Sequence, residues 1–135
     1  MATLKTNTLT GTSTAGSIAV TGEANSTTTN LQQGLIKVWV NFDGTATDAA
    51  ARDSFNISGM TDNGTGDYTI TINNNMANDD YAGGTLARQD AGGSDAFSRQ
   101  SDTATNEVRL VHVNGTDGTL VDVDIGSVAL FGDLA

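Results

Sequence analysis

The stretch that decides the fold runs from residue 35 to residue 72 and begins LIKVWVNF at 35–42. Apolar side chains occupy every second position of that opening, at Ile36, Val38, Val40 and Phe42. This alternation has the two-residue period of a half-buried strand. The segments SFNI (54–57) and YTITI (68–72) are also strand-like, and DNGTGD (62–67) between them has the Asn-Gly and Gly residues of a tight turn. The stretch therefore predicts a strand, a connection, a strand, a tight turn and a strand.

Strand patterns continue on both sides of this stretch, at 17–21, 81–88, 107–113 and 120–125, and an apolar run at 128–131 closes the chain. We expect 107–113 and 120–125 to form a hairpin, with Asp122 and Asp124 facing outward. Residues 26–30 break the strand pattern. Residues 46–52 are predicted to form a helical turn or loop, and 91–102 a surface loop. About six to eight strands without a helical period predict an all-β fold, an antiparallel β-sandwich or barrel.

Composition narrows the classes of function. The chain has 135 residues, room for one domain, with no Cys and no Pro. Six Lys and Arg stand against 16 Asp and Glu, a formal net charge of −10. Such a surface repels phosphate backbones and anionic lipids, so we expect neither a nucleic-acid partner nor a membrane partner. The first residues lack the apolar core of a secretion signal, which predicts synthesis and use in a cytoplasm unless an assembly carries the chain out.

Residues 1–34 are rich in Thr, Ser and Gly and have few apolar side chains. We predict an extended N-terminal arm (1–34) that docks on another chain, followed by a β-sandwich domain (35–135), because the arm has too little apolar surface to hold itself in place. Trp39 falls on the polar face of its strand, where it either covers a second small core or sits in an oligomer contact. The expected docking and oligomer contacts are Leu4, Leu9, Ile18, Val20, Leu31 and Trp39.

The sequence offers little catalytic or metal-binding chemistry. His112 is the only histidine and has no nucleophile nearby in sequence, so we expect a structural or surface role. Two clusters offer oxygen ligands for calcium, Asp62, Asn63 and Asp67, and Asn78, Asp79 and Asp80. Neither follows the EF-hand pattern, and turn formation is the simpler explanation. We expect no catalytic residues, no cofactor and no metal.

Several segments resemble virion proteins of tailed phages, especially phages of marine bacteria. They are LTGTSTAGSI (9–18), TTTNLQQGLIKVWVNFDG (27–44), RDSFNI (52–57), TDNGTGDYTI (61–70) and MANDDY (76–81). The resemblance covers more than half of the chain and ends before Ala82.

This resemblance implies a non-enzymatic, homotrimeric structural protein of the virion, made in the host cytoplasm. Our first expectation is a decoration or fibre-like protein on the capsid, docked by its arm on the major capsid protein or another virion protein. The alternative is a tail-fibre tip or adhesin that binds a receptor, such as a glycan, on the host surface. A carbohydrate-degrading tail enzyme is the third.

Overall fold

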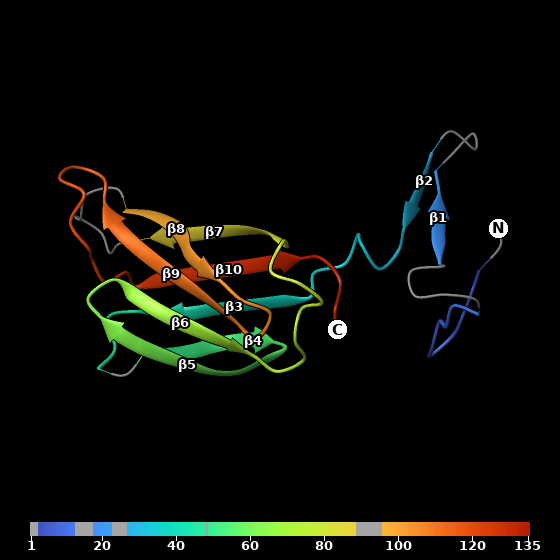
Figure 1. Cartoon of the computed structure of the whole chain (residues 1–135), viewed down its shortest axis with the longest axis horizontal. Helices are drawn as coiled ribbons and strands as arrows, with labels where there is room; N and C mark the ends of the chain where they lie inside the picture. The colour runs from blue at the N-terminus through green and yellow to red at the C-terminus, as the bar shows by residue number, and fades with distance from the viewer. Residues whose placement is uncertain (1–2, 13–17, 23–26, 48, 89–95) are drawn as a thin grey trace. The chain divides into compact units, whose positions relative to one another are not determined.

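The computed structural model describes residues 3–12, 18–22, 27–47, 49–88 and 96–135 (Figure 1). These residues form ten strands and no helix, and all strand pairs are antiparallel. The all-β prediction is therefore confirmed. The chain divides into two compact units, residues 1–35 and 36–135, which are described in turn.

The larger unit contains two four-stranded sheets that face each other as two layers (Figure 1). Sheet I has the order β4-β3-β10-β7, with bounds Ala50–Phe55, Val38–Asp43, Ile125–Phe131 and Ala82–Arg88. Sheet II has the order β5-β6-β9-β8, with bounds Ile57–Gly64, Asp67–Ile72, Glu107–Asn114 and Ala96–Thr103. The predicted antiparallel sandwich is the observed architecture.

The core lies between the two sheets and follows the predicted alternation. Val38, Val40 and Phe42 of β3 are buried, and they face the buried side of β6. Ile36 shares their sequence phase, but it precedes β3 and is exposed. The remaining large core residues are Tyr68, Ile70, Ile72, Met76, Tyr81, Val108, Leu110, Val128 and Leu130.

The chain passes from sheet I to sheet II at a sharp corner between β4 and β5. Asn56 occupies that corner with φ 60°, a conformation that Asn tolerates better than most residues. Its side-chain amide donates hydrogen bonds to the Lys37 carbonyl (3.1 Å) and the Asn74 carbonyl (3.0 Å). The prediction of a helical turn or loop at 46–52 is wrong for its last residues, because Ala50 and Ala51 pair with β3 as the start of β4. Cross-strand pairing there overrides the helical preference of alanine.

The predicted hairpin of 107–113 with 120–125 is wrong. Over residues 108–111, β9 is hydrogen-bonded to β6 on one side and to β8 on the other, so only its last residues have an edge free for the returning chain. Leu120 makes only an isolated bridge to Val113, and the chain then crosses to sheet I, where β10 pairs with β3 and β7. Asp122 and Asp124 accordingly do not form a solvated strand face, and both accept hydrogen bonds from other side chains.

One further segment of the larger unit is a strand although it lacks an apolar alternation. β8 (Ala96–Thr103) lies where a surface loop was predicted, and it pairs along its length with β9. It is an edge strand of sheet II and is mostly polar, which is why its sequence lacks the usual strand pattern. Residues 91–95 of the predicted loop lie outside the described residues.

The smaller unit contains the hairpin of β1 (Ala19–Thr21) and β2 (Thr28–Asn30). β1 confirms the described part of the strand predicted at 17–21, whereas β2 falls where the pattern was thought to break. Leu4, Leu9 and Val20 of this unit are exposed, at 78%, 53% and 51%. Its docking role remains a prediction.

Candidate functional surfaces

The outer face of sheet I carries a row of apolar residues that runs across all four strands. Trp39 of β3 lies opposite Phe55 of β4 on one side and opposite Ala129 of β10 on the other. Ala129 in turn lies opposite Gly84 of β7. Directly opposed residues point to the same face of a sheet, so these four share one surface.

The neighbouring row adds a third large apolar side chain, Leu86. Asn41, Ser127 and Leu86 are opposed across β3, β10 and β7. Leu86 is 73% exposed and Phe55 53%. The two rows enclose a shallow groove of about 480 Å³, and its lining includes Trp39, Asn41, Gly84, Leu86, Ser127 and Ala129. We call this the sheet I groove. None of the described residues that line it is charged.

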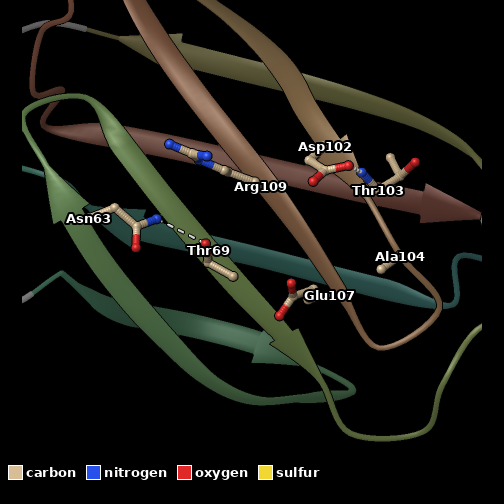
Figure 2. Close-up of a pocket in the computed structure, with 7 residues that line it drawn as sticks. All are labelled: Asn63, Thr69, Asp102, Thr103, Ala104, Glu107 and Arg109. Carbon is tan, nitrogen blue, oxygen red and sulfur yellow. Dashed lines mark hydrogen bonds between the residues drawn. The ribbon is translucent and has the colours of Figure 1, made fainter.

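The outer face of sheet II carries a polar pocket of about 280 Å³ instead (Figure 2). Its lining combines amide, hydroxyl, carboxylate and guanidinium groups from all four strands and the β8–β9 turn: Asn63, Thr69, Asp102, Thr103, Ala104, Glu107 and Arg109. Figure 2 shows the hydrogen bond in which the Asn63 amide donates to the Thr69 hydroxyl, at 2.9 Å. We call this the sheet II pocket.

An ion pair beside the sheet II pocket holds part of its lining in place. Arg109 Nε donates to Asp67 Oδ1 at 2.8 Å, and Arg109 Nη2 donates to Asp67 Oδ2. The hydrogen bonds from Arg109, helped by one from Asn63, hold the pKa of the Asp67 carboxyl below its usual range. A general acid for sugar hydrolysis needs the opposite shift, so Asp67 suits a structural role.

The oxygen clusters considered for calcium have other partners. Asp67 is paired with Arg109, and Asp62 Oδ1 accepts from the Gly64 amide at 2.8 Å. Asn78 Oδ1 likewise accepts from the Asp80 amide at 3.0 Å, which closes a local turn. Among the described residues, no three His, Asp or Glu side chains are grouped so as to hold a metal ion.

The space between the sheets contains an aromatic cluster that the sequence did not indicate. The fully buried His112 ring stacks on Phe42, with ring centroids 5.7 Å apart, and lies 5.5 Å from the Tyr68 ring. Neither His112 ring nitrogen has a hydrogen-bond partner among the residues that the structure describes. Burial lowers the pKa of His112 to about 4, so the ring is neutral at pH 7. His112 therefore has a structural place, one of the two roles expected for it.

The Tyr68 hydroxyl anchors the same end of the core. It lies 2.9 Å from the Gly44 carbonyl and 2.7 Å from Asp122 Oδ1, which also accepts from the Gly66 amide. Burial, reinforced by the Asp122 carboxylate, raises the pKa of the Tyr68 hydroxyl. Asp122 thus fastens the crossing segment to sheet II, through β6 and the turn that precedes it.

The predicted contact residues are divided between the two units. Leu4, Leu9 and Val20 are exposed, while Ile18 and Leu31 are half-buried, all within residues 1–35. Trp39 lies in the larger unit, on the outer face of sheet I, with Phe55 and Leu86, which were not predicted. The segments that contain them, 54–57 and 81–88, were predicted to be strands. Only the strand registers show that Phe55 and Leu86 lie on the same face as Trp39.

No protein-family model matches the chain, and neither a curated protein nor a solved structure matches it.

The described parts of the chain include no helix with the length and apolar character needed to cross a membrane.

Proposed function

We propose that the protein is a non-enzymatic structural component of a phage virion, a homotrimer that decorates the capsid surface and is docked there by its N-terminal segment, residues 1–34. The resemblance of residues 9–81 to virion proteins supplies the class. The observation that carries the assembly role is the exposure of large apolar side chains in both units of the chain.

The energetic argument concerns the outer face of sheet I. Burying a Leu or Phe side chain fully is worth about 1.5–3 kcal/mol, so Leu86, Phe55 and Trp39 together represent a sizeable driving force for association. Trp39 and Phe55 are directly opposed, and Leu86 lies in the neighbouring row of the same face, where it lines the sheet I groove together with Trp39. A contiguous apolar patch on an otherwise acidic surface favours a protein partner.

The N-terminal segment supplies the second apolar set. Leu4, Leu9 and Val20 are exposed, and its hairpin has only three residue pairs. A two-stranded hairpin of this size is marginal by itself in water. Contact with the major capsid protein, another virion protein or a second copy would supply the missing burial.

The test is incorporation into particles. Full-length protein and a variant without residues 1–34 are supplied to particles that lack the protein, and bound copies are counted by quantitative mass spectrometry. We expect many full-length copies per particle and almost none of the truncated variant, which circular dichroism should show to be folded. Normal occupancy by the truncated variant contradicts the docking role, and a few copies located at the tail contradict the capsid location.

The sheet II pocket favours a second candidate, a tail-fibre tip or adhesin that binds a host-surface glycan. Amide, hydroxyl and carboxylate groups converge there, and these are the groups that bind sugar hydroxyls. Free protein should then compete with phage adsorption. The substitutions Asn63→Ala and Glu107→Ala should remove the competition, while Thr61→Ala, outside the pocket on β5, should keep it. Absence of competition by the unsubstituted protein rejects this candidate.

A further inference from the structure

We propose that the sheet I groove receives the N-terminal segment of a second copy of this chain. This inference rests on the proposed function, in which residues 1–34 mediate assembly, and it names the surface that they contact. The argument uses the shape of the groove, the apolar side chains of the segment and the distribution of charge between the two units.

The floor of the groove is made of small residues. Gly84 and Ala129 lie side by side there, next to Ser127, while Trp39 and Leu86 are larger members of the lining. A Cβ added at Gly84 would meet nothing within 4 Å, so the space above this residue is open. The opening suits an aliphatic side chain from another segment.

The N-terminal segment has side chains of the required kind. Leu4 and Leu9 are exposed, and both are followed by Thr-rich sequence that favours extended backbone. Leu and Thr side chains on a segment with no charged residue from 6 to 22 match a groove without charged lining. Neither surface would have to bury an unpaired charge.

Charge decides between the N-terminal segment and a second sandwich face as the occupant. Residues 36–135 contain five Lys and Arg and fifteen Asp and Glu, which leaves −10, whereas residues 1–34 contain one Lys (Lys5) and one Glu (Glu23) and have no formal net charge. Two sandwich domains placed face to face would repel each other. The N-terminal segment has no formal net charge, so the acidic domain does not repel it as it repels a second sandwich domain.

A contact of this type is heterologous, since one copy gives its segment and the next gives its groove. Heterologous contacts form closed rings when the rotation between copies closes. Three copies arranged in this way would form the homotrimer proposed above, with every groove filled.

The absence of cysteine from the chain makes the contact directly testable. One tagged variant carries Leu4→Cys, Leu9→Cys or Val20→Cys, and a second variant with a different tag carries Gly84→Cys. The matched control for the second variant is Gly59→Cys on β5, where an added Cβ also meets nothing within 4 Å. The two variants are mixed and oxidised, and disulfide-linked heterodimers are separated by mass on a non-reducing gel.

We expect at least one N-terminal position to cross-link to Gly84→Cys about tenfold faster than to Gly59→Cys, because a disulfide forms only when the two Cα atoms come within about 7 Å. No cross-link, or equal rates with both partners, overturns the proposal. A double variant, Leu9→Cys with Gly84→Cys, that closes only within single chains also overturns it, because the occupant is then the chain's own segment. Rapid Gly84→Cys homodimers without N-terminal cross-links would place a second sandwich face there and overturn it too.

The outcome separates this inference from the proposed function. If removal of residues 1–34 abolishes incorporation into particles but no cross-link to Gly84→Cys forms, the segment docks on a different virion protein. The proposed function then stands and this inference fails. If the cross-link forms but truncation leaves incorporation unchanged, the inference holds and the docking role fails.

Discussion

The outer faces of the two sheets differ although their inner faces are alike. Both sheets bury alternating apolar side chains against the same core. Outside, sheet II presents polar groups such as Asn63 and Thr69, which hydrogen-bond to each other, with one exposed aromatic residue, Phe97, on its edge strand β8. Sheet I presents Trp39 and Leu86 around an open groove, with Phe55 beside Trp39. A sandwich folds with either kind of outer face, so folding does not require the apolar one. The difference is the basis of our proposal that the outer face of sheet I contacts another chain.

The first test of this comparison adds the same side chain to an inner and to an outer glycine of sheet I. Gly126→Val should destabilise the fold by about 3 kcal/mol, the upper part of the usual range for overpacking a core. The reason is that a Cβ there would lie 2.3 Å from Phe42 Cζ and 2.8 Å from His112 Cε1. Gly84→Val on the outer face should change the free energy of unfolding by no more than about 0.5 kcal/mol. Urea denaturation measures both, and equal losses would mean that the faces are wrongly assigned.

The interior of the sandwich gives a second test, in which pH is the variable. His112 has a pKa of about 4 in the fold against about 6.5 unfolded, so the unfolded chain takes up a proton first. Stability is complete above pH 6.5 and falls as the pH drops from 6.5 to about 4, by about 3 kcal/mol in total. His112→Phe keeps an aromatic ring in the stack and should lack this loss.

Urea midpoints of the unsubstituted protein and of His112→Phe, measured between pH 7.5 and 4.5, test this prediction. Both proteins have the same carboxyl groups, so the contribution of these groups to the pH dependence cancels when the two proteins are compared. The difference in the free energy of unfolding between the two should grow in favour of the variant as the pH falls. A difference that stays constant with pH would show that His112 is not held neutral by burial.

The two outer faces can be compared directly by adding the same charge to each. Leu86→Asp should weaken self-association by about 30-fold, corresponding to loss of about 2 kcal/mol at an interface hot spot. Thr61→Asp, on the exposed surface of β5, should weaken it less than about threefold, since a rim or remote charge has a small effect. Sedimentation equilibrium measures both constants, with urea denaturation as the control for folding. Equal effects on both faces would remove the assigned role of sheet I.

The smallest expected effect concerns the Tyr68 hydroxyl. Tyr68→Phe removes a group that lies within hydrogen-bond distance of the Gly44 carbonyl and the Asp122 carboxylate. The expected loss is about 1–2 kcal/mol in the free energy of unfolding, with self-association unchanged once the variant is folded. Loss of association in a fully folded variant would mean that the core and the outer groove are coupled.

Much of the fold follows from sequence because its central strands show alternation. Val38 to Phe42 and Tyr68 to Ile72 are half-buried strands that a periodic pattern reveals directly. β8 is an edge strand with polar residues, so no local pattern revealed it. Residues 120–125 were predicted to pair with 107–113, whereas the strand that follows them, β10, pairs with β3 and β7 of the other sheet. Which strands pair with each other depends on the strand edges that remain free, and a local sequence pattern does not show this.

The candidate surface was predictable only in part, for the same reason. Trp39 stands out because it is a lone aromatic residue on a polar strand face. Phe55 and Leu86 become its neighbours through the registers of β4 and β7, which no local pattern specifies. The polar lining of the sheet II pocket likewise comes from residues up to 46 positions apart, Asn63 and Arg109, brought together by the pairing of β6 with β5 and β9.

Trp39 is the only tryptophan, so its fluorescence tests the central claim, that another chain covers the outer face of sheet I. The full-length protein is diluted across its association range, and acrylamide quenching of the emission is measured at each concentration. We predict that Trp39 is shielded at high concentration and becomes more quenchable, with a red-shifted emission, as the copies dissociate. Quenching and emission that stay constant while sedimentation shows dissociation would contradict the claim.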